Sequence, residues 1–245
     1  HTSLASIPYS VTGRARLIIK ESGVISGLHV AQEVFNVTDE SLHTELLLHD
    51  GDAVRYGDIA LTVAGRAQSI LRAERLVLNI MQRMSGIATA TALYTERVRD
   101  TRAKITDTRK TTPGMRALEK EAVRTGGGVN HRMGLYDMIM LKDNHIDYAG
   151  GIAEAIRRTR EYLSAGRLDL RIEVEARNIR EVKEILETGG VDRIMLDNFN
   201  IPDTREAVAL IAGRTETESS GGITIENVRD YALCGVDYIS IGALT

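Results

Sequence analysis

Residues 170–198 read LRIEVEARNIREVKEILETGGVDRIMLDN, and this stretch decides the fold. It begins with a short, largely apolar run at 170–176, continues with a helical pattern at 178–188, and ends with a second such run at 192–198. This order is typical of a βαβ unit, in which a crossover helix joins two parallel strands. The stretch therefore predicts an α/β fold.

The same alternation extends through the chain from residue 103 onward. Further strand candidates are KITDT (104–108), MIMLKD (138–143), TETESSGG (215–222) and YISIGA (238–243). We expect the other helices of this part near 113–125, 151–163, 203–212 and 224–233. Six strand candidates are too many for a small sheet fragment and nearly enough for a closed parallel barrel.

The chain before residue 103 has a different, β-rich pattern. Strand candidates lie at 11–20, 45–48 and 59–63, with a short helix at 29–37 and turn residues at 50–52 and 57–58. Residues 70–101 have helical composition, but Ser85-Gly86 interrupts them, so we expect one helix to end there and another to begin near Ile87. This break predicts a domain boundary between 1–86 and 87–245.

Composition and charge exclude several classes of protein. The 245 residues carry a formal net charge of −3 and 43% hydrophobic residues, values that are typical of globular domains. A single cysteine, Cys234, excludes an internal disulfide framework and a cysteine-based zinc site. The charge argues against nucleic-acid binding. The chain shows no apolar run of membrane-spanning length and no signal-peptide pattern, and we expect a cytoplasmic protein without membrane contact.

Polar residues end the strand candidates, and this is the informative feature for function. In a TIM-type barrel these ends converge on one face, where catalysis takes place. Cations end the early strands or lie in the loop between them, and carboxylates belong to the middle strands. The cations are Arg109, Lys110, His131, Arg132 and Lys142, and the carboxylates are Glu173, Glu175 and Asp197.

Opposite charges on two sides of one cleft suit an anionic substrate together with a metal-bound phosphate group. Arginine holds carboxylates bidentately, lysine acts as a point charge on phosphate, and Mg²⁺ prefers acidic oxygens. The alternative for each single residue is a solvated ion pair at the barrel rim.

The last two strand ends are rich in small residues. Ser220-Gly221-Gly222 and Gly242-Ala243 offer backbone N–H groups that no large side chain hinders, and we expect a helix to start at Thr224. Barrels often bind phosphate after their last two strands, and a helix N-terminus favours anions. The alternative is that these glycines only allow tight turns.

Residues 107–146, DTRKTTPGMRALEKEAVRTGGGVNHRMGLYDMIMLKDNHI, strongly resemble the quinolinate phosphoribosyltransferases, also called nicotinate-nucleotide pyrophosphorylases (carboxylating). Supporting matches are AERLVLNIMQRMSGIAT (73–89), IEVEARN (172–178), IMLDN (194–198), SSGGIT (219–224) and VDYISIGALT (236–245). The resemblance covers essentially the whole chain and is specific, because it combines TRK, NHR and LKDNH at fixed spacing.

The resemblance implies a fold and a reaction. The fold is an N-terminal α/β sandwich domain followed by an incomplete TIM-like α/β barrel, usually assembled as a homodimer. The reaction joins quinolinate to phosphoribosyl pyrophosphate with Mg²⁺ and yields nicotinate mononucleotide, CO₂ and pyrophosphate, in de novo NAD biosynthesis. It thus implies a pentosyltransferase.

The resemblance also implies roles for residues. Quinolinate would contact Arg109, His131 and Arg132, with Arg75 arriving from the partner subunit, and Lys110 and Lys142 would lie between the two substrates. Glu175 and Asp197 would hold the ribose hydroxyls and the metal-bound pyrophosphate, and Ser220, Gly221, Gly222, Gly242 and Ala243 the 5′-phosphate. Thr108 and His145 complete the implied substrate-binding set.

Two positions need separate comment. Arg177 follows the strand where the family often has an acidic residue, and no role for it is evident. Arg75 would point away from the core if its helix buries Leu76, Ile80 and Met84, and its alternative is a surface ion pair with Glu74.

Three other functions compete with this reading. The closest is a paralogue with the same scaffold and another acid as ligand, such as a molybdenum-transport accessory protein. A Schiff-base aldolase that uses Lys110 or Lys142 is the second. A non-catalytic binding module is the third, and it leaves the cluster of cations unexplained.

Overall fold

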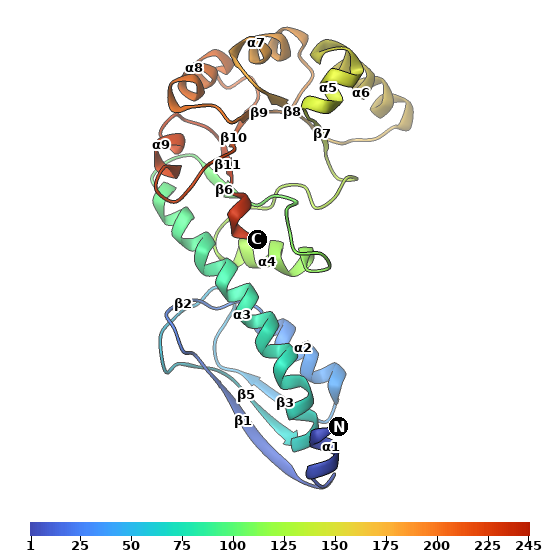
Figure 1. Ribbon diagram of the computed structural model, residues 1–245, viewed down its shortest axis with the longest axis vertical. Helices are drawn as coiled ribbons and strands as arrows, with labels where there is room; N and C mark the ends of the chain where they lie inside the picture. The colour runs from blue at the N-terminus through green and yellow to red at the C-terminus, as the bar shows by residue number, and fades with distance from the viewer. The chain divides into compact units, whose positions relative to one another are not determined.

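The computed structural model describes residues 1–245 and divides into two compact units (Figure 1). The first unit consists of His1–Ala92 and Thr112–Gly127, and the second of Leu93–Thr111 and Gly128–Thr245. No helix is both long enough and apolar enough to cross a bilayer.

The first unit is built on a small antiparallel sheet. Its strands pair in the order β1 (Thr12–Ile18), β5 (Ile59–Arg66) and β3 (His43–Leu46). A second, two-stranded sheet consists of β2 (Gly23–Val24) and β4 (Ala53–Val54). The helices are α1 (Thr2–Ser6), α2 (Leu28–Thr38), α4 (Arg116–Thr125) and the first part of α3 (Ala67–Val98). The sheet, α2 and the first part of α3 share one aliphatic core, so this unit is the expected α/β sandwich.

The α3 helix does not break at Ser85-Gly86, and this expectation was wrong. Met84 and Ile87, on either side of the pair, are buried, and the Ser85 hydroxyl is bonded to the backbone of Ser26. A glycine costs a helix interior about 1 kcal/mol, which the burial of its neighbours outweighs.

The buried face of α3 also differs from the expected one. It contains Ala73, Val77, Met81 and Met84, spaced three or four residues apart, whereas Leu76 is 54% exposed. Arg75 is exposed beside it.

The second unit is a parallel barrel that stays open. Its strands are β6 (Lys104–Thr106), β7 (Ile139–Leu141), β8 (Ile172–Ala176), β9 (Arg193–Asp197), β10 (Glu216–Ser220) and β11 (Tyr238–Ser240). They pair in parallel in the order β6-β11-β10-β9-β8-β7, and no pairing joins β7 back to β6. The predicted α/β class and the incomplete barrel are confirmed.

Helices cover the outside of this arc of strands (Figure 1). They are α5 (Asp143–Ala149), α6 (Ile152–Gly166), α7 (Ile179–Thr188), α8 (Ile201–Ile211) and α9 (Val228–Ala232). The short 3₁₀ helix η1 (Gly242–Leu244) follows the carboxyl end of β11. Alternate strand residues such as Val174, Ile194 and Leu196 are fully buried, as expected for strands covered by helices. The residues between them carry the polar groups of the site.

Candidate active site

The TRK segment begins at the carboxyl end of β6 and lies beside the last turn of the chain. The Lys110 N–H donates to the Thr108 hydroxyl at 3.0 Å, which tightens the segment. A Cβ placed on Gly242 would lie 3.6 Å from Cδ and 4.0 Å from Nζ of Lys110. The structure therefore brings Lys110 and the Gly242-Ala243 turn together, as predicted for one site.

The NHR segment is held next to TRK by the backbone and by Asp107. The Val129 N–H donates to the Ile105 carbonyl at 2.8 Å, so this segment extends the sheet beside β6. The buried Asp107 carboxylate accepts the His131 N–H at 2.9 Å and also the Asn130 side-chain amide. Asp107 was not predicted as a site residue, although a lone acid directly after an apolar strand was the available signal.

Arg109 and Arg132 form a pair of cations with little compensation. Burial lowers the pKa of Arg132, and the nearby charge of Arg109 lowers it further. The Arg132 guanidinium donates to the Met138 carbonyl at 3.2 Å. The Arg109 Nε is buried and has no hydrogen-bond partner. A bound anion would offset both the burial of these guanidinium groups and their mutual repulsion.

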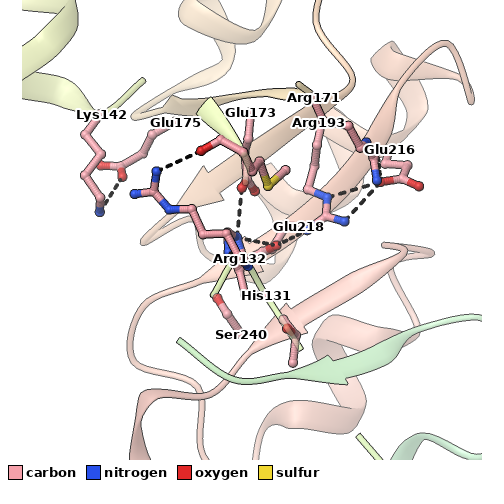
Figure 2. A network of polar contacts seen from close by, with 12 residues as sticks. His131, Arg132, Lys142, Arg171, Glu173, Glu175, Arg193, Glu216, Glu218 and Ser240 are labelled. Carbon is pink, nitrogen blue, oxygen red and sulfur yellow. Dashed lines mark hydrogen bonds and ion pairs between the residues drawn. The ribbon is translucent and has the colours of Figure 1, made fainter. Parts of the chain in front are cut away.

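Lys142, Glu175 and Asp197 lie together at the ends of β7, β8 and β9. The Lys142 Nζ is 3.3 Å from the Glu175 Oε2 (Figure 2). Burial raises the pKa of Glu175, the Lys142 charge opposes this, and Asp197 raises it again. We call Glu175 and Asp197 the mouth carboxylates, because they end their strands beside the cations. The exposed His145 has its Nδ1 at the Lys142 N–H, 3.0 Å away, so it caps α5.

The glycine turn after β10 has the open backbone that was predicted, but not the predicted helix. Gly221 and Gly222 have φ values of +92° and +61°, and a Cβ on Gly221 would lie 2.2 Å from the Asn198 Oδ1. The α9 helix begins only at Val228, and the Thr224 N–H already donates to the Asn227 Oδ1 at 2.8 Å. Any anion here would meet the N–H groups of the glycine turn rather than a helix N-terminus.

A group of charged side chains lies deeper in the barrel, and we call His131, Glu173, Arg193 and Glu218 the buried network (Figure 2). The His131 Nε2 is 2.8 Å from Glu173 Oε2 and 3.5 Å from Glu218 Oε2. The Arg193 guanidinium donates to Glu218 at 2.8 Å and stacks 3.8 Å over the Tyr238 ring.

Both acids of this network hold their protons unusually tightly. Burial raises the pKa of Glu173 to about 7 against the opposing charge of Arg193. Burial and the neighbouring Glu173 raise the pKa of Glu218 to about 7. Glu218 and Arg193 were missed by the sequence reasoning, although charged residues inside otherwise buried strands were a usable signal.

Two remaining residues are now placed. Arg75 lies in the first unit, exposed, and forms no ion pair with Glu74 or any other residue. Arg177 hydrogen-bonds to Glu181 at 2.9 Å and to Asp147 at 3.3 Å, so it ties α7 to α5 and has a structural role.

The fold and the site together define an α/β-barrel protein that gathers cations, carboxylates and glycine turns at the carboxyl ends of its strands. Family models identify it more closely: residues 1–85 match the quinolinate phosphoribosyl transferase N-terminal domain, and residues 87–245 the C-terminal domain. The chain belongs to the quinolinate phosphoribosyltransferase family.

Individual relatives agree with this assignment. The chain is 46% identical to quinolinate phosphoribosyltransferase [decarboxylating] 1b of Nicotiana tabacum, over all of this chain and 73% of the relative. It is 43% identical to a probable nicotinate-nucleotide pyrophosphorylase [carboxylating] of Bacillus subtilis, over 94% of this chain and 78% of the relative. The crystal structure of NadC from Streptococcus pyogenes superposes with a TM-score of 0.94 at 41% identity, covering all of this chain and 85% of that one.

Proposed function

We propose that this protein is a quinolinate phosphoribosyltransferase. It joins the ring nitrogen of quinolinate to the anomeric carbon of phosphoribosyl pyrophosphate and releases pyrophosphate and CO₂, which leaves nicotinate mononucleotide for NAD biosynthesis. The observation that carries the proposal is the Arg109–Arg132 pair, two partly buried guanidinium groups whose charges act on each other: burial and Arg109 together lower the pKa of Arg132, and the Arg109 Nε has no hydrogen-bond partner.

Quinolinate is a dianion, so it suits this pair of cations. Each arginine fork can take one carboxylate bidentately, which fixes the plane of the ring. Lys142 and Lys110 add point charges toward the second, phosphorylated substrate. In this arrangement the ring nitrogen points at the anomeric carbon because both carboxylates are held, which converts a bimolecular attack into an oriented one.

Phosphoribosyl pyrophosphate would lie with its 5′-phosphate at the Gly221-Gly222 turn and the Gly242-Ala243 turn, with Ser220 adding a hydroxyl. Its anomeric carbon gains positive character as the bond to pyrophosphate breaks, and the mouth carboxylates stabilise that charge. Lys142 lies 3.3 Å from Glu175, which keeps one of these carboxylates paired before substrates bind.

The mouth carboxylates also fit Mg²⁺. This ion prefers one or two carboxylates, with water and substrate phosphates as its other ligands. The negative charge of Asp197 raises the pKa of Glu175, because the two carboxylates repel each other. A cation bound between them would remove this repulsion. Bound there or on the pyrophosphate, Mg²⁺ would supply charge neutralisation of the leaving group.

Loss of the 2-carboxylate follows from the chemistry of the nucleotide. Once the ring nitrogen is joined to the ribose it carries a positive charge. The electron pair of the C2–carboxylate bond can then remain at C2, beside that charge, as CO₂ departs and C2 takes up a proton. No further cofactor is needed for this step.

The direct test is an assay with quinolinate, phosphoribosyl pyrophosphate and Mg²⁺ that follows CO₂ and pyrophosphate together. Equal yields of the two products support the proposal. No product with either substrate withheld is the control. Absence of both products with quinolinate, combined with borohydride trapping of a keto substrate on Lys110 or Lys142, would favour an aldolase instead.

The homodimer is a further part of the proposal and rests on Arg75. This side chain is exposed and unpaired on α3, as expected for a residue that serves a site in a partner subunit. An isologous dimer would then contain two sites, each completed by the other subunit.

Subunit complementation tests this sharing. Inactive Arg75→Ala protein is mixed with inactive Arg109→Ala protein under conditions that exchange subunits. A mixed dimer has one site with both defects and one with neither, so up to about half of normal activity per mixed dimer should return. No recovery despite verified exchange would place Arg75 outside a shared site.

A cytoplasmic location also belongs to the proposal. Plant relatives are named as chloroplastic or mitochondrial, so the compartment needs its own measurement. Fractionation of the source cells followed by immunoblotting provides it.

A further inference from the structure

Asn198, which directly follows Asp197, is one of three residues other than glycine with a left-handed backbone. Its φ is +56°, in a region that asparagine enters more readily than most residues. The other two, Arg167 and Ala212, are the C-caps of α6 and α8, where such a conformation is common. Asn198 instead ends a strand in the candidate site, so its conformation needs another explanation.

The left-handed turn brings the Asn198 side chain back onto the residue before it. The Asn198 Nδ2 donates to the Asp197 Oδ2 at 2.7 Å, and no other hydrogen bond of the chain reaches this carboxylate. The Asn198 backbone N–H continues the pairing of β9 with β10 by donating to the Ser220 carbonyl at 2.8 Å. One oxygen of the Asp197 carboxylate is thus held, and the other is bonded to no group of the chain.

The same side-chain amide lies against Gly221 in the glycine turn. A Cβ on Gly221 would lie 2.2 Å from the Asn198 Oδ1 and 2.7 Å from the Asn198 Cγ. A side chain at position 221 would therefore displace this amide, so the close approach requires glycine in addition to the positive φ. Asn198 thus contacts both a mouth carboxylate and the turn that we propose for the 5′-phosphate.

Two helices hold the backbone that follows Asn198. The carbonyl of the buried Phe199 accepts the Tyr231 hydroxyl of α9 at 2.9 Å. The Asn200 side chain is the N-cap of α8 and accepts the Asp203 N–H at 2.8 Å. The turn is therefore held on both sides, which fixes where the Asn198 amide lies.

We propose that Asn198 is a positioning residue of the active site, whose amide holds the Asp197 carboxylate in one orientation beside the glycine turn. This inference rests on the proposed function in one respect, that Asp197 acts on the ribose or on the metal-bound pyrophosphate. With Oδ2 held by the amide, the carboxylate presents Oδ1 to the substrate. It then needs no reorganisation as the anomeric carbon gains positive charge.

Two other roles compete with positioning. A residue needed only for the left-handed turn would be replaced fully by glycine, which adopts a positive φ without strain. An amide that binds the substrate itself would lose its effect independently of Asp197. The hydrogen bond to Asp197 and the contact with Gly221 engage both polar atoms of the amide, which favours positioning.

Asn198→Gly tests the amide, because glycine keeps the backbone conformation and removes only the side chain. We expect kcat at saturating substrates to fall about fivefold to tenfold, as for one lost hydrogen bond, with the Kd for quinolinate and the urea midpoint close to wild type. Asn200→Ala is the matched control, since it removes a helix cap and should lower the urea midpoint while kcat is unchanged. A wild-type kcat in Asn198→Gly, or an equal fall of kcat in both variants, would overturn the proposal.

A double-mutant cycle with Asp197→Ala separates positioning from direct contact with the substrate. In the Asp197→Ala background, Asn198→Gly should lower kcat by less than about twofold, because the positioned carboxylate is already gone. Additive losses would mean that the Asn198 amide acts on the substrate independently, and would overturn the proposal.

The orientation of the Asp197 carboxylate provides a readout that needs no activity. Crystal structures of wild-type and Asn198→Gly protein in the same crystal form should show one orientation in the wild type, and a different one or several in the variant. The same single orientation in both would overturn the proposal. If the wild-type protein forms no nicotinate mononucleotide, the proposed function fails, while this comparison still decides whether Asn198 holds Asp197.

Discussion

Two glutamates, Glu173 and Glu175, lie two residues apart on the same face of β8, but their environments differ. Glu173 is fully buried and faces His131 and Glu218, whereas Glu175 ends the strand beside Lys142 and Asp197. Successive residues of a strand alternate between its faces, so both point into the barrel at different depths. The same alternation of side chains along β8 therefore places Glu173 in the buried network and Glu175 at the carboxyl end of the barrel, among the mouth carboxylates.

Depth decides what each group of charges can do. In the buried network every ion faces a protein partner, and a buried ion pair contributes specificity of arrangement more than net stability. At the mouth, the Arg109 Nε has no hydrogen-bond partner, and burial with the charge of Arg109 outweighs the carboxylates near Arg132 and lowers its pKa, so a bound anion would stabilise both guanidinium groups. The lower group should therefore respond to mutation through folding, and the upper group through binding and turnover.

The largest expected effect is on stability, from Arg193→Met in the buried network. Removing the guanidinium leaves Glu218 and Glu173 without their main compensating charge, which typically costs about 3–5 kcal/mol of unfolding free energy. Urea unfolding measures it. Arg171→Met is the matched control: Arg193 and Arg171 both contact Glu216, at 3.1 Å and 2.5 Å, but Arg171 is half exposed, so its loss should cost no more than about 1 kcal/mol. Equal losses of unfolding free energy in both variants would mean that the depth of an arginine in the barrel does not determine its contribution to stability.

The next effect is on binding, from Arg132→Ala at the mouth. Losing one partner of a desolvated charge pair should cost about 2–5 kcal/mol of quinolinate binding, with a much smaller loss for phosphoribosyl pyrophosphate. Isothermal titration calorimetry with each substrate measures both. If the two substrates weaken equally, Arg132 is not a carboxylate ligand.

A smaller effect is expected on turnover, from Asp197→Asn. The charge of this mouth carboxylate matters most as positive charge develops at the anomeric carbon, so kcat at saturating substrates should fall about tenfold to a hundredfold while quinolinate Kd stays nearly constant. Glu206→Gln, an exposed acid on α8, serves as control. If Asp197→Asn keeps the wild-type kcat, Asp197 is only part of an ion pair at the rim of the barrel and does not act in turnover.

The features of the molecule that could be predicted from the sequence are those with a periodic or local pattern. Alternating strands and helices predict the parallel sheet, and the ends of those strands predict Arg109, Lys142, Glu175 and Asp197. The continuity of α3 could not be predicted, because Gly86 breaks helices locally and only burial of Met84 and Ile87 outweighs it.

The buried network was out of reach for a different reason. Glu173, Arg193 and Glu218 come from three strands, and only the register of β8, β9 and β10 brings them together. Interactions across strands are set by tertiary register, which residue spacing along one segment does not contain.

The last expected effect concerns the pH dependence of stability, which appears only over a limited pH range. Glu173 and Glu218 have pKa values raised from 4.5 to about 7, so between these values the folded protein keeps protons that the unfolded chain releases. Stability from these groups is then fully present below about pH 4.5 and is lost as the pH rises through about 7. Glu218→Gln removes one of these titrations, so its unfolding free energy relative to wild type should rise between about pH 4.5 and pH 7, by up to about 3 kcal/mol, and stay constant above that range.

Glu216→Gln is the control with the opposite sign. Burial would raise the pKa of Glu216, but hydrogen bonds from Arg171 and Arg193 outweigh it and lower this pKa below the usual value. Its stabilising effect is lost only as the pH falls below the usual carboxyl range, so the difference between Glu216→Gln and wild type should stay constant from about pH 5 to pH 8. Urea midpoints at a series of pH values compare the two variants. Parallel pH profiles for both would mean that Glu218 titrates like a surface acid, and that the depth of a carboxylate in this barrel does not set its role.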